Sequence, residues 1–213
     1  MASRGSISGR AACQALGLAS VAGSERNGPA AAVVAKRGQF GAEVMATIEH
    51  LHDHPDDSSR GLYLLDCDAF ADIVPALSDL PGEFFVALLI ADFSAVSREV
   101  LVDLSRELIA AGARYFCAWG RDCQVAHLAF DLACCEFETD SEAVILTTDP
   151  SRESIEAAIW FATVCAYPVD PYDRGWNATV AICVSDRAAS QTVRKAFTDP
   201  IAFSKSHGPA IED

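Results

Sequence analysis

The chain has 213 residues and a formal net charge of −14 at pH 7. Residues 41–213 carry 11 basic and 29 acidic side chains, a net charge of −18, which repels phosphate backbones and anionic lipid headgroups. This balance disfavours nucleic acid and membrane as partners, and no apolar run approaches the roughly 20 residues that a spanning helix needs. We therefore expect an acidic, soluble, cytoplasmic protein.

Lysine occurs only at Lys36, Lys195 and Lys205. A Walker-type phosphate loop and a buried Schiff-base lysine therefore have no candidate among the predicted strands, and we expect no cofactor. Of the eight cysteines, no two form a Cys-x-x-Cys pair, and Cys117, Cys165 and Cys183 fall inside predicted strands or a helix. This pattern favours reduced, buried thiols over a disulfide scaffold or a zinc site.

The chain begins with a segment of residues 1–35 that is rich in Ala, Gly and Ser and lacks aromatic residues. We expect it to be a disordered tail ahead of a single domain at residues 39–205. Its arginines would also suit an organellar transit peptide, so both readings stay open. Over residues 39–51, apolar side chains recur at helical spacing at Phe40, Val44, Ile48 and Leu51, which predicts an amphipathic helix.

A histidine cluster follows this predicted helix. His50, His52 and His54 alternate with other residues, and carboxylates lie close by. Three imidazoles with carboxylates could ligate a transition metal. Pro55 also marks a helix end, where exposed polar residues are expected without any metal, and we favour that interpretation.

A short apolar run at residues 62–65 predicts a strand, and Asp66 and Asp68 follow it. This pair of aspartates resembles the start of a haloacid-dehalogenase-type site. Ala69 and Phe70 stand where such a site would continue with a threonine.

Four longer apolar runs follow, each separated from the next by a segment of helical period; they are residues 84–91, 114–119, 143–148 and 178–184. Because a half-exposed antiparallel strand would alternate polar with apolar residues, these runs indicate a parallel sheet covered on both faces. We predict a three-layer α/β domain with a mainly parallel sheet of 4–5 strands, Rossmann-like or flavodoxin-like.

The segments that follow the runs predict helices with a stripe of apolar side chains toward the sheet. The inward positions expected are Val100, Leu101, Leu104, Leu108, Val125, Leu128, Leu132, Ile155, Ala158, Ile159, Ala162, Val193 and Phe197.

An aspartate stands just beyond each of the four strands: Asp92, Asp122, Asp149 and Asp186. Aspartate is a favoured N-cap, so capping of the following helix is the first explanation for each. The carboxyl ends of parallel strands nevertheless meet at one edge, where doubly wound folds bind ligands. We predict a ligand-binding rim formed by Asp92, Ser94, Trp119, Gly120, Arg121, Asp122, Thr148 and Asp149.

Residues 119–123 are the richest segment of this rim. Gly120 allows a tight turn, and Arg121 offers a forked donor for a carboxylate or phosphate. Cys123 would lie in the first helical turn, where the helix dipole and the arginine lower a thiol pKa, and His127 is four residues on. The segment therefore predicts either an activated Cys123 nucleophile or a cysteine packed at a helix start.

Three motifs carry a resemblance to a known family: residues 115–123, the Leu-Thr-Thr of residues 146–148, and a helix with Glu153, Trp160 and Phe161. This set resembles a family of short bacterial proteins that carry a domain of unknown function. The resemblance spans residues 84–190 and implies a bacterial cytoplasmic setting. The sequence departs from it at residues 149–150, where Asp-Pro replaces an expected Trp-His pair.

Two classes of function follow from these observations. A binding or accessory module would use the rim to hold a small ligand or a protein partner, and the scarcity of lysine and the lack of a complete catalytic triad favour it. The alternative is a small hydrolase or transferase that uses Cys123, or a metal-dependent enzyme that uses the rim aspartates.

Overall fold

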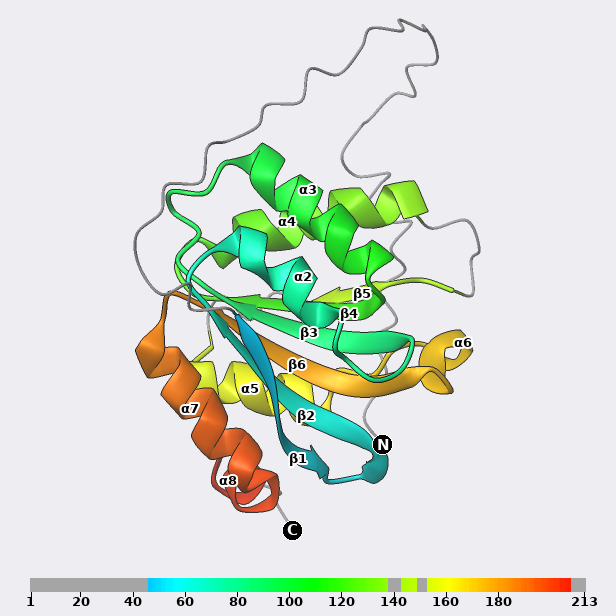
Figure 1. Ribbon diagram of the computed structural model, residues 1–213, viewed down its shortest axis with the longest axis vertical. Coiled ribbons are helices and arrows are strands. Elements are labelled where there is room, and N and C mark those ends of the chain that lie inside the picture. The colour runs from blue at the N-terminus through cyan, green and yellow to red at the C-terminus, as the bar shows by residue number, and fades with distance from the viewer. Residues whose placement is uncertain (1–45, 138–142, 149–152, 208–213) are drawn as a thin grey trace, which may run out of the picture.

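The computed structural model describes residues 46–137, 143–148 and 153–207, which form one sheet with helices on both faces (Figure 1). The predicted tail of residues 1–35 lies outside this part. The strands are β1 (Thr47–His54), β2 (Asp57–Cys67), β3 (Phe84–Ile90), β4 (Ala113–Trp119), β5 (Leu146–Thr148) and β6 (Trp176–Val184). The helices are a 3-10 turn (Phe70–Asp72), α2 (Ile73–Leu77), α3 (Arg98–Ala110), α4 (Cys123–Phe137), α5 (Ile155–Val164), α6 (Asp170–Asp173), α7 (Arg187–Thr198) and α8 (Pro200–His207).

The six strands lie in the order β1-β2-β6-β3-β4-β5. Strands β2 to β6 all pair in parallel, which confirms the parallel arrangement predicted for the four long apolar runs. β1 is an antiparallel edge strand beside β2. The sheet thus has six strands rather than 4–5. Its order differs from the Rossmann-like and flavodoxin-like orders, because the last strand, β6, is inserted between β2 and β3.

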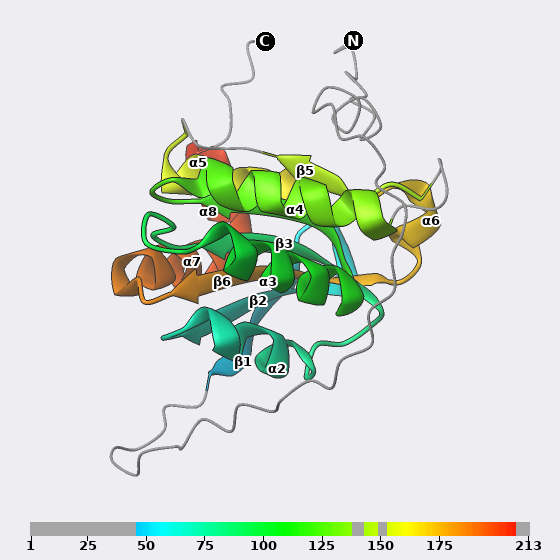
Figure 2. The ribbon, with the colours of Figure 1, turned by 90° about the horizontal axis from the view of Figure 1, so that it is seen from above.

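The helices form two layers: α2, α3 and α4 cover one face of the sheet, above it in Figure 1 and in front of it in Figure 2, and α5, α7 and α8 cover the other. After β2 and β3 the chain therefore continues to the layer of α2, α3 and α4, whereas after β6 it continues to the layer of α5, α7 and α8. Neighbouring connections that depart to opposite faces leave a crevice between them, the usual ligand site of doubly wound folds. None of the helices in the described part of the chain has the length and apolar character needed to cross a membrane.

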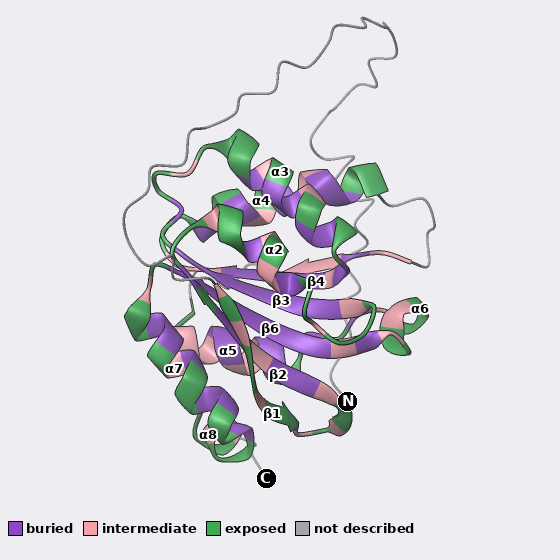
Figure 3. Cartoon of the chain, viewed as in Figure 1, coloured by how far each residue is buried: buried purple, intermediate pink, exposed green. Residues whose placement is uncertain are grey.

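Side chains of the central strands alternate between two cores. In β3, Phe85, Ala87 and Leu89 face α2, α3 and α4, whereas Val86 and Leu88 face α5 and α7. Because both faces of β3 are covered, the strand is buried along almost its whole length (Figure 3). This double burial explains why the four runs are nearly continuous in apolar residues.

The predicted helix of residues 39–51 is wrong where the structure describes it, because residues 47–54 form the edge strand β1. Ile48 and Leu51 are each half-buried and pack against different cores, Ile48 on the α2 side and Leu51 on the α5 side. Their spacing of three fits a strand as well as a helix. Irregular register between His50 and His52 and between Asp53 and His54 interrupts the strand period.

The predicted inward face of α4 is also wrong. Val125 and Leu128 are exposed, at 38% and 50%, and Leu132 is half-buried. The buried residues of the helix are instead small ones together with Phe130: Cys123, Ala126, Ala129, Phe130, Ala133 and Cys134. Phe130 stacks on Phe116 of β4 with ring centroids 4.1 Å apart.

The other helices follow the prediction with one exception. Val100 at the start of α3 is 48% exposed, whereas the remaining predicted positions of α3, α5 and α7 face the core; buried among these are Leu101, Leu104, Leu108, Ala158, Ile159, Ala162, Val193 and Phe197. Cys117 and Cys183 are buried free thiols as expected, but the free thiol of Cys165 is exposed, because it follows the last residue of α5. The expectation of reduced thiols is wrong at Cys135, which is disulfide-bonded.

Candidate functional site at the carboxyl edge

Asp92 closes a local turn after β3. Its Oδ1 accepts hydrogen bonds from the hydroxyl and the backbone N–H of Ser94, at 2.6 and 2.9 Å. These bonds, with a smaller contribution from Arg121, hold the pKa of Asp92 below its usual value. The N-cap of α3 is Ser97, whose side chain accepts from the N–H of Val100. The capping role predicted for Asp92 is therefore wrong.

The turn after β4 lies directly against the turn after β3. The N–H of Ala91 donates to the Trp119 carbonyl at 3.1 Å, and the N–H of Phe93 donates to the Arg121 carbonyl at 2.9 Å. Gly120 has φ 125°, and a Cβ there would lie 2.0 Å from the Ala91 carbonyl oxygen. Glycine is thus required by the close approach of two backbones, and the turn brings together predicted rim residues from both loops.

Asp122 has a left-handed backbone with φ 57°, and its carbonyl oxygen accepts from the N–H of Val125 at 3.0 Å. Its exposed carboxylate accepts no hydrogen bond from the described residues. Asp149 lies outside the described part of the chain. Among the described aspartates, only Asp186 fulfils the predicted capping role. Its Oδ1 accepts a hydrogen bond from the N–H of Ala189 at 2.9 Å, at the start of α7.

Trp119 and Thr148 make structural hydrogen bonds. The Trp119 indole N–H donates to the Glu153 carbonyl at 3.1 Å, and Thr148 Oγ1 lies 2.8 Å from the Tyr115 hydroxyl. The first bond joins the end of β4 to the residue before the N-cap of α5, and the second joins β4 to β5. The polar atoms of both residues therefore have partners within the protein.

Cys123 is buried, with 2% of its surface exposed. Cys123 therefore lacks the partial exposure that a nucleophile requires. His127 does not need Cys123 as a partner, because its Nδ1 pairs with Asp131 Oδ2 at 3.3 Å. Asp131 in turn accepts from the Thr147 hydroxyl at 2.7 Å, which ties α4 to β5.

A groove of about 670 Å³ lies at the carboxyl ends of β2 and β6, beside the first turns of α7. It occupies the place where the chain departs from β2 and β6 to opposite faces of the sheet (Figure 1). Its described lining consists of Thr47, Glu49, Leu64, Asp66, Cys67, Asp68, Ser185, Asp186, Arg187 and Arg194. None of the residues predicted for the rim is in this lining. Those that the structure describes lie on the β3, β4 and β5 half of the same edge.

Some charges in the groove are already paired. Arg194 Nη1 lies 2.7 Å from Glu49 Oε2, and the Ser190 hydroxyl donates to Asp66 Oδ2 at 2.8 Å. Asp68 and Arg187 are exposed, and neither side chain forms a hydrogen bond or ion pair with another described residue. The groove thus presents one carboxylate and one guanidinium that are available to a ligand.

Cys67 also lines the groove but is chemically quiet. Burial, followed by the carboxylates of Asp72, Asp66 and Asp68, raises the pKa of the Cys67 thiol to about 12. At neutral pH this thiol is protonated, and a protonated thiol is a poor nucleophile and metal ligand.

The three histidines considered as metal ligands lie on β1, and two of them contact Asp53. His50 Nε2 is 3.4 Å from Asp53 Oδ1, His52 Nδ1 is 2.7 Å from the Asp53 carbonyl oxygen, and His54 is buried. Among the described residues, no group of three or more His, Cys, Asp or Glu side chains is arranged to hold a metal ion.

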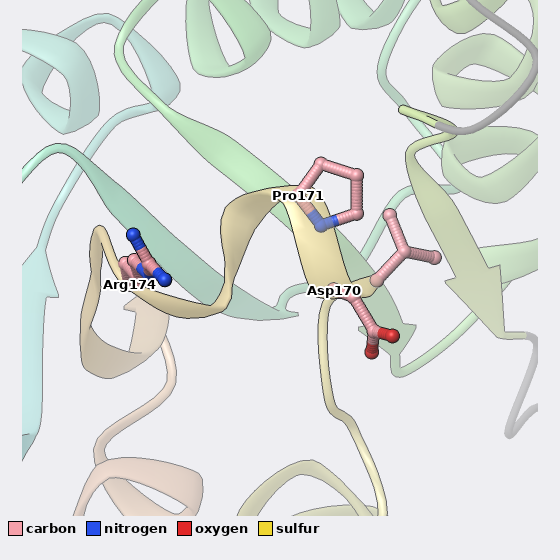
Figure 4. Close-up of a pocket in the computed structure, with 4 residues that line it drawn as sticks. Asp170, Pro171 and Arg174 are labelled. Atoms are coloured by element: carbon pink, nitrogen blue, oxygen red, sulfur yellow. The ribbon is translucent and has the colours of Figure 1, made fainter.

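A second hollow, of about 770 Å³, lies beside α6 at the opposite edge of the sheet. It is lined by Val169, Asp170, Pro171 and Arg174. Figure 4 shows that the charged ends of Asp170 and Arg174 lie apart and do not point toward one another. This open hollow has no converging polar groups among its described residues.

Comparison with known proteins places the chain in a family. No curated protein matches the sequence. A family model described as a domain of unknown function, DUF7684, matches residues 63–200, from the middle of β2 to the start of α8. The match includes the carboxyl ends of β2 to β6 and most of the groove lining. The chain therefore belongs to the DUF7684 family, a domain of unknown function.

Proposed function

We propose that the protein is a binding or accessory module that holds a small polar ligand in the groove at the carboxyl ends of β2 and β6. The observation that carries this proposal is the position of the groove, between a connection that leaves toward α2 and one that leaves toward α7. This is the position at which open α/β sheets bind their ligands.

The lining of the groove supports a polar, charged ligand. The free carboxylate of Asp68 and the free guanidinium of Arg187 come from the ends of two neighbouring strands. Together they suit a ligand with both a positively charged and a negatively charged or hydrogen-bonding group. A purely anionic ligand would also meet Asp66 and Asp186 and the overall charge of −14.

The buried position of Cys123 favours binding over covalent chemistry. A nucleophile must reach a substrate, and a thiol with 2% exposure beneath a helix turn does not. Thiol labelling in native buffer tests this point. We expect the exposed Cys165 to react well before Cys123, and fast, pH-dependent labelling of Cys123 would restore the hydrolase or transferase alternative.

Binding can be tested by titrating the full chain with a panel of amines, amino acids, carboxylates, nucleotides and Mg²⁺. A ligand that binds should lose at least tenfold in affinity in Asp68→Asn and in Arg187→Gln. The matched controls are Asp92→Asn and Arg121→Gln, which change the same charges in the other half of the edge. If only these control variants weaken binding, the site lies at the originally predicted rim and the groove assignment is wrong. A response to Mg²⁺ alone would favour the metal-dependent alternative.

A further inference from the structure

His54 lies at the amino edge of the sheet, at the opposite end of the strands from the groove. It is the last residue of β1 and is 3% exposed. Its ring packs edge-on against Trp176 at the start of β6, with centroids 6.0 Å apart, and against Tyr167, 6.4 Å away. A histidine so enclosed must satisfy both ring nitrogens within the protein.

Both nitrogens are hydrogen-bonded, and the bonds fix the tautomer. The N–H of Asp56 donates to Nδ1 at 3.2 Å, so Nδ1 carries no proton. Nε2 then carries the proton and donates to the Thr163 carbonyl oxygen at 2.7 Å, near the end of α5. His54 is thus neutral, and it connects the turn between β1 and β2 to the end of α5.

Asp56, in the turn between β1 and β2, makes a second connection, to the segment that follows α5. Its Oδ2 accepts a hydrogen bond from the Tyr167 hydroxyl at 2.8 Å, although the two residues are 111 positions apart in the chain. Burial, and then this bond, raise the pKa of Tyr167 to about 12. The backbone of Asp56 therefore holds His54, while its side chain holds Tyr167.

The charged and titratable groups around His54 come from four elements. Burial lowers the pKa of His54, with Arg60 acting in the same direction, whereas the Thr163 carbonyl, Asp56 and Asp57 oppose the shift. Arg60 lies over the Trp176 ring at 3.8 Å and is paired with Asp173 of α6 at 2.7 Å. The groups that face the site are Asp56, Asp57, Arg60, Cys165, Tyr167 and Asp173.

We propose that protonation of His54 transfers the Asp56 carboxylate from Tyr167 to His54 and so releases the segment after α5 from the β1–β2 turn. A proton from solvent adds to the Nδ1 lone pair, and an imidazolium can no longer accept the Asp56 N–H. The new Nδ1–H needs an acceptor, and the Asp56 carboxylate lies on the same turn and attracts a charged His54 more strongly than the Asp57 carboxylate does. The charge-assisted bond replaces the neutral one to Tyr167, while the bond to Thr163 stays in place.

The release has a direct structural consequence. Tyr167 is 36% exposed and packs edge-on against Trp176 at 5.1 Å. Without Asp56 as its acceptor, the Tyr167 hydroxyl turns to solvent and the residues between α5 and α6 lose their hydrogen bond to the hairpin, which leaves the ring contact between Tyr167 and His54. The device makes this amino edge sensitive to pH in the weakly acidic range.

The test is an NMR titration of the full chain from pH 8 to pH 5 that follows the His54 imidazole and the Tyr167 ring in the same samples. We expect both to shift with one midpoint below 6.5, and hydrogen exchange of the backbone amides of residues 165–167 and 169 to rise with it. His54→Gln should abolish the Tyr167 shift. His52→Gln, an exposed histidine on the same strand, should leave both curves unchanged.

Asp56→Asn provides a second variant in case His54→Gln does not fold. An asparagine can still accept from Tyr167 but carries no charge to attract the imidazolium. We expect the His54 midpoint to fall by about 0.5 pH unit or more and the Tyr167 shift to disappear. The proposal is overturned if Tyr167 stays unchanged while His54 titrates, or if its shift persists in either variant.

Discussion

The hydroxyl of Ser185 donates a hydrogen bond to the carbonyl oxygen of Asp68 at 2.7 Å. The N–H of Ser185 also donates to the Cys67 carbonyl at 2.9 Å, and Ser185 has a left-handed backbone with φ 53°. These bonds connect the loop after β6 to the loop after β2. Beyond them, the two segments continue to opposite faces of the sheet. The wall of the groove is therefore held by Ser185 and two backbone carbonyls, which leaves the side chains of Asp68 and Arg187 free to contact a ligand.

Replacing Asp186 with alanine should destabilise the fold by about 1 kcal/mol, because the N–H of Ala189 loses its capping partner. Urea unfolding monitored by circular dichroism measures the loss. Asp92→Ala is the matched control, since Asp92 closes a turn and caps no helix. An equal or larger loss in the control would show that the two strand-end aspartates do not differ as described.

Gly120→Ala should cost at least about 2 kcal/mol of unfolding free energy. The added Cβ meets the Ala91 carbonyl oxygen at 2.0 Å, and φ 125° is strained for any side chain. Gly82→Ala, also at positive φ, meets the Asn177 side chain instead, which can move more easily than a backbone. We expect a smaller loss for Gly82→Ala, and a loss at Gly120 below that at Gly82 would contradict the close packing of the two loops.

Leu128→Ala and Phe130→Ala test which face of α4 meets the sheet. Leu128 is 50% exposed, so its truncation should change the unfolding free energy by less than about 0.5 kcal/mol. Phe130 is fully buried on Phe116, and its truncation should cost about 3–5 kcal/mol. The reverse order of the two losses would restore the orientation predicted from sequence.

That orientation failed for a physical reason. Both sides of α4 are apolar in sequence, and the larger residues Val125, Leu128 and Leu132 drew the prediction. The structure instead turns alanines to the sheet, because small side chains let a helix lie close to a strand surface while Phe130 fills the remaining space. When a helix has two apolar faces in sequence, only its packing against the neighbouring layers decides which face meets the sheet.

Folding stability should decline as the pH falls below 6.5, the usual pKa of histidine. Folded His54 has a lowered pKa, so the unfolded chain takes up the proton first and unfolding becomes easier with acid. The stability that His54 provides is complete above 6.5 and is lost as the pH falls toward the folded pKa. Asp57 and Asp92 also have lowered pKa values, but they act only below their usual 3.8.

The window between pH 5 and 7 thus isolates His54. Urea unfolding at several pH values should give a sloping free energy for the natural chain and a flat one for His54→Gln, whatever the absolute loss in the variant. The same slope in both proteins would contradict the assignment.

The sequence predicted the parallel sheet well because burial on both faces leaves a signal within each strand. It failed at β1, an edge strand with one antiparallel neighbour, where Ile48 and Leu51 fit two periods. The alternation of His50, His52 and His54 was itself a strand-like signal, but we interpreted it as an exposed helix end, with a metal site as the less favoured alternative.

The groove could not be derived from local pattern, because it depends on β6 lying beside β2. The loops after these strands are 117 residues apart where Ser185 meets Asp68. Asp66, Asp68 and Asp186 were recognisable as aspartates that follow strands. Only the strand order, which places β6 beside β2, shows that they lie together at one groove. Glu49, Arg187 and Arg194 carried no motif that pointed to the site.

The most direct test of the proposed function is to map ligand-induced amide shifts by NMR on the full chain, using the tightest binder from the panel. The groove assignment predicts that the largest shifts fall at residues 66–68 and 185–187, with little change at 92–94 and 119–122. Shifts concentrated at 92–94 and 119–122, with residues 66–68 and 185–187 unaffected, would contradict it.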